Sequence, residues 1–274
     1  MTQWALRWGP RICIWELPLL LLLALGVFIS IPIALGGTGL SSDALNHHIY
    51  LGWVADHSRF DRDLLAASYQ SYQFPYLYWP LYKLAAGGAS GVTAGVVLAL
   101  VHLLAVPPTW LIARTCMPGQ ALFDVGMRFS AVILAFMTSA ILLLFGTTSN
   151  DLNAAVPLIW SIAFAVAPLD SYRAPWMTRQ RCIVLSGILA GVAIAVKLSN
   201  GPLVVLLPGL WWAIGRGHKE RLGMVFVGCI GALAGLVATY GYWGWSLWTV
   251  FGNPIYPLYD PVFEVVRHWV GWQS

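Results

Sequence analysis

The sequence predicts an all-α polytopic membrane protein with about seven transmembrane helices and further amphipathic helices outside the bilayer. Apolar residues make up 59% of the 274 residues, and charged residues only 9%. A soluble domain averages about 25% charged residues. Several apolar runs also reach the length of about 20 residues that a helix needs to cross a bilayer. We therefore expect a single membrane domain over residues 1–274.

Each apolar run is taken as one membrane-spanning helix. The expected spans are 14–35, 89–113, 127–146, 151–168, 182–198, 202–215 and 222–246. The first span is too long for a signal peptide that is removed, and it lacks the cleavage site of small residues that such a peptide has. GxxxG spacings at Gly187 and Gly191 and at Gly231 and Gly235 predict close helix packing.

The basic residues predict the orientation. In this topology ten of the 15 lie in inner segments, and five lie in much longer outer segments, which favours a cytoplasmic N-terminus and an outer loop at 38–88. We expect a multi-pass cytoplasmic (inner) membrane protein whose 38–88 loop is periplasmic or extracellular. The inner set is Arg7, Arg11, Arg114, Arg128, Arg173, Arg179, Arg181, Arg216, Lys219 and Arg221. Their scatter through short loops gives no sign of nucleic-acid binding, and the four cysteines match no metal or disulfide pattern.

The outer loop 38–88 is the segment most typical of a site. From Ser42 it predicts an amphipathic helix with Leu45, Ile49, Gly52 and Trp53 on one face. The other face is expected to carry Asp43, His47, Tyr50 and His57. His47 and His48 are adjacent and should point to different faces, so we expect them to contact a substrate or the membrane interface rather than to share a metal ion.

Asp43 itself has two possible roles. As an acid in the first turn of a helix it stabilises the helix dipole. As a carboxylate held at the membrane surface it is a candidate general base.

An aromatic stretch follows at Tyr69–Tyr82 and includes Tyr76 and Trp79. Its composition suits a helix in the headgroup layer. It equally suits a platform for sugar rings or for a lipid-linked substrate.

Two further polar groups are expected on the same membrane face. Asp151 begins the fourth span, and juxtamembrane acids are candidate functional residues. Lys197 closes the fifth span beside Ser199 and Asn200, where an ammonium and the next helix N-terminus would favour an anion. The alternatives are a dipole-stabilising acid at Asp151 and a lysine that extends to the surface at Lys197.

In order along the chain, these motifs resemble the GT-C superfamily of integral-membrane glycosyltransferases, in particular bacterial lipid A aminoarabinose transferases and the protein O-mannosyltransferases. The resemblance covers nearly the whole chain. It rests on the segments SSDALNHHIY, QFPYLYWPLYKL with LIARTC, GTTSNDLNAAV, and AGVAIAVKLSNGP with the later WSLWTVFGNPIYPLYDPVF.

The resemblance implies transfer of a sugar from a polyprenyl-phosphate-linked donor to a lipid or glycan acceptor outside the membrane. Asp43 would be the general base, Asp151 would assist the acceptor or a divalent metal, and Lys197 would hold the donor phosphate. Asn253 lies in the matching Gly-Asn-Pro loop. Arg59, Arg62, Lys83 and Arg267 are further candidate phosphate partners.

Family members usually contain many more helices, so the resemblance also implies a C-terminally short chain or an additional chain that completes the fold. Two other functions stay open from the sequence. One is a transporter or flippase of an anionic lipid or solute, and the other is a non-catalytic subunit of a membrane complex.

The last segment, 247–274, is expected to lie outside the membrane. We predict that Gly252–Tyr259 folds back toward the 38–88 loop and walls a cavity above Asp43. A short interfacial helix is predicted to follow from Asp260, with Glu264 and Arg267 paired at i, i+3.

Overall fold

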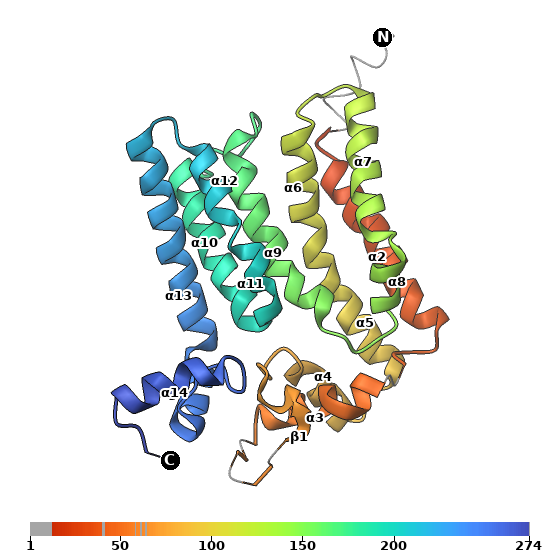
Figure 1. Ribbon diagram of the computed structural model, residues 1–274. Helices are drawn as coiled ribbons and strands as arrows, with labels where there is room; N and C mark the ends of the chain where they lie inside the picture. The colour runs from red at the N-terminus through yellow and green to blue at the C-terminus, as the bar shows by residue number, and fades with distance from the viewer. Residues whose placement is uncertain (1–12, 40–41, 58, 61, 64, 274) are drawn as a thin grey trace.

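Two layers make up the structure: a bundle of long helices, and a layer of short elements that covers one end of it (Figure 1). The computed structural model describes residues 13–39, 42–57, 59–60, 62–63 and 65–273. The covered end of the bundle is called the loop end. The end where α6 finishes and α7 begins is called the far end.

The bundle consists of α2 (Glu16–Ala34), α5 (Gly91–His102), α6 (Val106–Cys116), α7 (Leu122–Phe136), α8 (Ser139–Leu144), α9 (Asp151–Val166), α10 (Arg179–Val196), α11 (Gly201–Val204), α12 (Leu207–Ile214) and α13 (His218–Phe251). Short turns η3 (Leu103–Ala105), η4 (Ala167–Leu169) and η5 (Leu198–Asn200) extend or join them. The covering layer consists of η1 (Ala44–His48), α3 (Ile49–Val54), β1 (Ala66–Tyr69), η2 (Gln70–Tyr72), α4 (Trp79–Ala86) and α14 (Asp260–Trp269).

Five helical runs of the described chain are long and apolar enough to cross a membrane. They are Glu16–Ala34, Gly91–Cys116, Asp151–Leu169, Arg179–Val196 and His218–Phe251. Membrane-protein class is therefore supported, whereas seven spans are not confirmed. The predicted run 127–146 breaks after Phe136, because Thr138 caps a new short helix by accepting from the Ile141 amide at 3.3 Å.

The predicted run 202–215 is likewise divided, into α11 and α12. Both divided runs lie lengthwise beside neighbouring bundle helices (Figure 1). Whether they also cross a bilayer stays a prediction.

Glycine lets α10 and α13 approach closely. A Cβ at Gly187 would lie 2.2 Å from the Gly228 carbonyl oxygen, and one at Gly191 would lie 1.9 Å from that of Ala232. From the other side, a Cβ at Gly235 would lie 2.1 Å from the Ile188 carbonyl oxygen. The close packing predicted from the GxxxG spacings is confirmed, and the contact holds the loop ends of both helices together.

The C-terminal segment folds back onto the covering layer, as predicted. The ring of Tyr72 lies 5.1 Å from that of Phe251 and 4.9 Å from that of Tyr256, and Trp243 donates from Nε1 to the Tyr72 carbonyl at 3.0 Å. A helix, α14, then begins at Asp260.

The predicted ion pair between Arg267 and Glu264 in α14 was wrong. Arg267 pairs with Asp260, with Nη1–Oδ1 at 2.8 Å and Nη2–Oδ2 at 3.1 Å, rather than with Glu264. Asp260 and Arg267 are two helical turns apart and face the preceding loop, where Arg267 also donates to the Phe251 carbonyl at 3.3 Å. This pairing clamps α14 to the end of α13.

Candidate functional site

A buried pair of imidazoles lies in the covering layer, at the end of η1. His47 and His48 are each 5% exposed, and their ring centroids are 4.3 Å apart. The expectation that they point to different faces was wrong. They end a π-helical turn, whose i→i+5 hydrogen bonds give more than four residues per turn, so the ordinary helical spacing does not apply.

The same turn changes part of the predicted apolar face, although Gly52 is buried as expected and Ile49 and Trp53 are half-buried. Leu45 is 69% exposed, whereas Ala44, His47, His48, Leu51 and Val54 are buried. The helix from Ser42 is present, but the side that it presents to the bundle differs in part from the one that a regular 3.6-residue period indicated.

Three residues from outside the turn fix the position of His48. Its ring stacks on Tyr78 at 4.8 Å with the planes 20° apart, and its Nδ1 lies 2.7 Å from the Thr148 hydroxyl. The side chain of Asn150 in turn interacts with Tyr78. Thr148 and Asn150 belong to the segment between α8 and α9, so this cluster joins the covering layer to the bundle.

Both predicted carboxylates act on this cluster. Burial, with a smaller contribution from the neighbouring His47, lowers the pKa of His48 to about 4, although the charges of Asp43 and Asp151 oppose the shift. Burial also lowers the pKa of His47, where Asp43 opposes the shift and Lys197 adds to it. The two imidazoles are therefore neutral near pH 7, and they lie between acidic and basic charges.

Asp151 and Lys197 form an ion pair at the edge of the cluster. The Lys197 ammonium contacts Asp151 Oδ1, and the Ser149 hydroxyl donates to Asp151 Oδ2 at 2.6 Å. The side chain of Asp151 is 53% exposed and that of Lys197 is 32% exposed. An ion pair so open to its surroundings contributes little to stability, so an anionic ligand could exchange for Asp151 at small cost.

Asp43 differs from Asp151 in its surroundings. It is exposed at the start of η1, and no basic side chain of the described residues forms an ion pair with it. Its charge instead acts on His47, His48 and Tyr78. Its carboxylate is therefore the more accessible of the two for accepting a proton.

A cavity of about 210 Å³, with a wall that is more apolar than polar, opens beside the cluster. Gln73, Phe74, Asn150, Lys197, Ser199 and Leu258 are among the residues that line it. The wall that Leu258 contributes agrees with the predicted return of the C-terminal loop. The cavity is lined by Asn150 and Lys197, and Asp43, above which we predicted it, is not among its lining residues.

Five other predicted substrate-binding or loop residues have side chains that already contact other groups of the protein. Tyr50 interacts with Arg59, Asp63 and Tyr72. Tyr76 packs against Phe74 at 5.3 Å and Trp243 at 6.3 Å, and Trp79 donates to Asp56 Oδ1 at 2.8 Å. Asn200 donates to the Ala154 and Ala193 carbonyls at 3.1 and 2.9 Å, and Asn253 donates to the Leu258 carbonyl at 3.0 Å. These contacts hold the loop end together, and the amide hydrogens of Asn200 are not free for a phosphate.

The aromatic stretch also departs from the single headgroup-layer helix that its composition suggested. Residues Gln73–Tyr78 form turns around Pro75, and helix α4 begins only at Trp79. Tyr72 and Tyr78 are buried, at 2% and 4% exposed. Tyr78, Thr148 and Asn150 were not predicted as site residues; the only signal was the polar run TTSN directly before Asp151.

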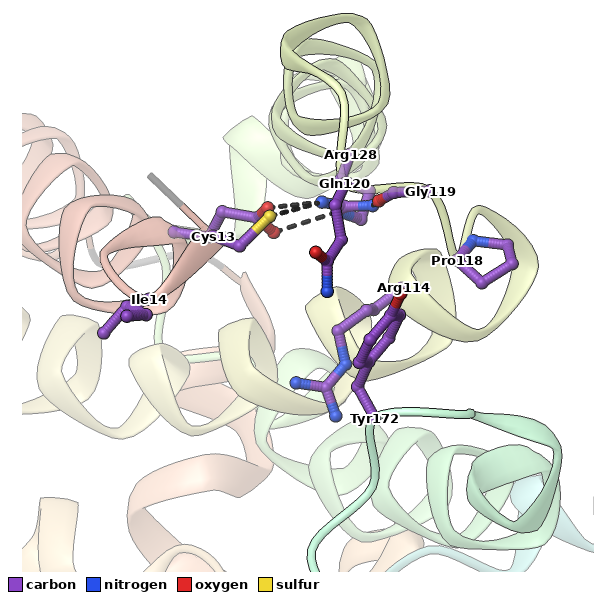
Figure 2. A pocket seen from close by; sticks show the side chains of 9 residues that line it. Cys13, Ile14, Arg114, Pro118, Gly119, Gln120, Arg128 and Tyr172 are labelled. Atoms are coloured by element: carbon purple, nitrogen blue, oxygen red, sulfur yellow. Dashed lines mark hydrogen bonds and ion pairs between the residues drawn. The ribbon is translucent and has the colours of Figure 1, made fainter. Parts of the chain in front are cut away.

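A second cavity, of about 190 Å³, lies at the far end (Figure 2). There the buried Arg128 pairs with Glu16 across the cavity and donates to the Met117 and Gly119 carbonyls at 2.6 and 2.7 Å. Trp110 donates to the same carboxylate at 2.9 Å. Because the guanidinium is fully engaged by protein groups, this cluster joins α2, α6 and α7 and does not present a site for a ligand.

Among the described residues, no group of three or more His, Cys, Asp or Glu side chains is arranged to hold a metal ion. His48 Nδ1 is in contact with Thr148 and is not available to a metal. The divalent metal left open by the resemblance gains no support from this geometry.

Comparison with known proteins adds no family to this description: no protein-family model, curated protein or solved structure matches the chain.

Proposed function

We propose that this chain is a membrane glycosyltransferase that moves a sugar from a polyprenyl-phosphate-linked donor to an acceptor hydroxyl at the loop end. One observation carries the proposal: the turn that begins after Asp43 places His48 against Thr148, three residues before Asp151, whose carboxylate contacts the Lys197 ammonium. A carboxylate that can accept a proton and an ammonium that can bind a phosphate thus belong to one site. This is the pair of charges that glycosyl transfer from a lipid phosphate requires.

In the proposed reaction Asp43 takes the proton of the acceptor hydroxyl. The acceptor oxygen then forms a bond to the anomeric carbon of the sugar, and the bond from that carbon to the phosphate oxygen breaks. The electron pair leaves with polyprenyl phosphate, whose charge Lys197 stabilises. Attack on the side opposite the leaving phosphate inverts the anomeric configuration.

Asp151 has a supporting role in this proposal. Its contacts with Lys197 and the Ser149 hydroxyl hold the ammonium at the cavity before the donor binds. When the phosphate arrives it replaces part of this ion pair. Neutral His47 and His48 add no positive charge that would compete with Lys197 for the phosphate.

The test is donor turnover by the purified protein in proteoliposomes. Polyprenyl-phosphate-linked hexoses and pentoses are supplied one at a time, with membrane extract as the source of acceptors, and released polyprenyl phosphate is measured. Asp43→Asn should reduce turnover by about 100-fold or more, the usual contribution of a general base. Asp63→Asn is the matched control, since Asp63 lies in the same layer but pairs with Arg59 at 3.2 Å.

Retention of wild-type turnover by folded Asp43→Asn would rule out the proposed base. Failure of every donor in the panel, with reconstituted flux of lipid or solute instead, would favour a transporter.

A further inference from the structure

A polar groove at the far end takes no part in the proposed sugar transfer. It has a volume of about 680 Å³ and lies between the segment 171–180 and the first turns of α13. Its wall is more polar than apolar, and the charged side chains that line it are those of Arg173, Arg179 and Glu220. It is called the far-end groove here.

The far-end groove is positively charged. The stretches 171–181 and 216–221, which contain its charged residues, have six basic residues and one acidic residue, Glu220. Arg179 contacts Glu220 at 3.4 Å. Arg173 donates to the Asp170 carbonyl at 3.0 Å, and within the described part of the chain no carboxylate forms an ion pair with it. Such an excess of one charge attracts a ligand of the opposite charge.

The segment that carries Arg173 is held firmly by its neighbours. Asp170 is 1% exposed, and its carboxylate accepts from the Tyr172 amide at 2.8 Å and from Arg114 Nε at 2.7 Å. On the other side of Arg173, Met177 is buried in a small apolar cluster at the start of α10. Because the backbone is fixed on both sides, the groove is formed before a ligand binds, which reduces the entropy lost on binding.

The exposed side chains of the same region indicate where the groove lies. Tyr172 and Trp176 are 54% and 50% exposed, and Leu169 is 62% exposed. Tryptophan and tyrosine are typical of the headgroup layer of a membrane. The segment also connects two helical runs that are long enough to cross a bilayer, Asp151–Leu169 and Arg179–Val196. The anion that this groove meets is therefore a phospholipid headgroup rather than a solute of open water.

We propose that the far-end groove binds the headgroup of an anionic phospholipid, with the lipid phosphate at Arg173 and Arg179. Guanidinium groups suit a phosphate because they donate two parallel hydrogen bonds to it. The bias of basic residues predicts that this end faces the cytoplasm, and basic pockets on that side of a membrane suit anionic lipids. The inference goes beyond the proposed function and does not depend on it.

Glu220 opposes this binding. Its side chain is 36% exposed and contacts Arg179, so a phosphate that enters the groove competes with its carboxylate. Its Oε2 accepts from the Arg216 amide at 2.9 Å, a contact that the amide oxygen of a glutamine also makes. Glu220→Gln therefore removes the competing charge and keeps the local fold.

The experiment is a titration of the whole chain in detergent with phosphatidylglycerol, with bound lipid counted by native mass spectrometry. Phosphatidylcholine with the same acyl chains has no net charge and should bind more weakly. Arg173→Gln should raise the Kd of the first phosphatidylglycerol about fivefold, which corresponds to the roughly 1 kcal/mol that one basic side chain contributes at an anionic membrane surface. Glu220→Gln should lower this Kd, an effect that misfolding cannot produce.

Arg59→Gln and Glu264→Gln are the matched controls, because they make the same changes of charge at exposed positions of the loop end, and they should leave the Kd unchanged. Three results would overturn the inference: equal affinity for the two lipids, equal weakening by Arg59→Gln and Arg173→Gln, or a Kd that Glu220→Gln does not lower. Displacement of phosphatidylglycerol by glycerol phosphate at the same concentration would also overturn it, and would indicate a soluble anion as the ligand.

Discussion

The histidine pair is held by aromatic stacking and burial and has little access to water. His48 has Tyr78 on one face, His47 at its edge and a single hydroxyl, that of Thr148, at Nδ1. Burial disfavours the charged form of an imidazole. The nearby carboxylates only partly offset that effect, so neutral His48 is a condition of this packing.

We therefore predict that the loop end loses stability as the pH falls from about 6.5 toward 4. Burial lowers the pKa of folded His48 to about 4, whereas an unfolded histidine titrates near 6.5. Between these values the unfolded chain binds a proton that folded His48 does not, so acid favours unfolding by at most roughly 1.4 kcal/mol per pH unit. Thermal unfolding followed by tryptophan fluorescence should show a lower midpoint near pH 5 than near pH 7.

His48→Phe keeps a ring against Tyr78 but cannot titrate, and its unfolding midpoint should depend less on pH than that of the wild type. His57→Phe is the control, because His57 is exposed and stacks on Trp53 at 4.7 Å. An identical pH dependence in all three proteins would contradict the assignment to His48.

The sequence predicted the charged residues of the site better than the uncharged residues that surround them. Asp43, Asp151 and Lys197 stand out because charge is rare in the chain and each lies next to an apolar run. Tyr78, Thr148 and Asn150 could not be recognised, since tyrosine, threonine and asparagine are common at membrane surfaces. Only the fold-back of the loop onto the start of α9 brings them to His48.

The α10–α13 contact decides how the loop end is positioned among the helices. Four small residues in two GxxxG spacings let the helices approach until backbone meets backbone. Van der Waals packing of this kind is a main source of helix association in membranes. The position of the Lys197 end of α10 is set by this approach.

Gly191→Leu should separate these helices and destabilise the protein. The added Cβ would lie 1.9 Å from the Ala232 carbonyl oxygen and 2.5 Å from the Leu236 amide nitrogen, and backbone atoms cannot rotate away as a side chain can. Overpacking costs about 1–3 kcal/mol in a core, and we expect a loss in the upper part of that range. Resistance to thermal unfolding in detergent measures it.

Gly209→Leu is the comparison variant, since nothing lies within 4 Å of a Cβ at Gly209. It should unfold within about 0.5 kcal/mol of the wild type, as surface substitutions usually do. Wild-type stability in Gly191→Leu would mean that α10 and α13 are further apart than described.

The presence of the long helices was predictable, because long apolar runs dominate the sequence. The positions at which some of these helices break were not predictable. The break after Phe136 depends on Thr138, and threonine occurs inside membrane helices as readily as at their caps. The π-turn at Ala44–His48 has no sequence signature of its own, and because of it Leu45 is exposed and His47 is buried, the reverse of what a regular helix predicted. Periodicity predicts which residues are helical more securely than which side they bury.

Across the whole molecule, polar chemistry is concentrated at the two ends of an apolar bundle. The far end has buried, fully paired charges at Glu16 and Arg128. The loop end has the exposed Asp43, the partly exposed ion pair of Lys197 with Asp151, and the unpaired Oδ1 of Asn150. Fully paired charges favour rigidity, and unpaired groups favour binding. This asymmetry is why the loop end, and not the far end, is the proposed site of sugar transfer.

The orientation of the two ends is the last prediction. The bias of basic residues predicts that the loop end faces out of the cytoplasm. Ser90 caps α5 at the loop end and Ser171 follows η4 at the far end, and both side chains are exposed. In a variant without Cys13, Cys116, Cys182 and Cys229, Ser90→Cys should react with an impermeant thiol reagent in intact cells, and Ser171→Cys should react only after permeabilisation.

Ser58 was a further predicted outer position, but it lies outside the described residues, so Ser90 provides the test. Because both chosen positions are exposed in the folded protein, a difference in labelling reports the side of the membrane and not burial. The reverse labelling pattern would place the loop end in the cytoplasm. Reaction of both variants in intact cells would contradict the seven-span topology, which places three spans between Ser90 and Ser171. It would instead indicate that 127–146 does not cross the membrane, because only two of the five candidate spans lie between these positions.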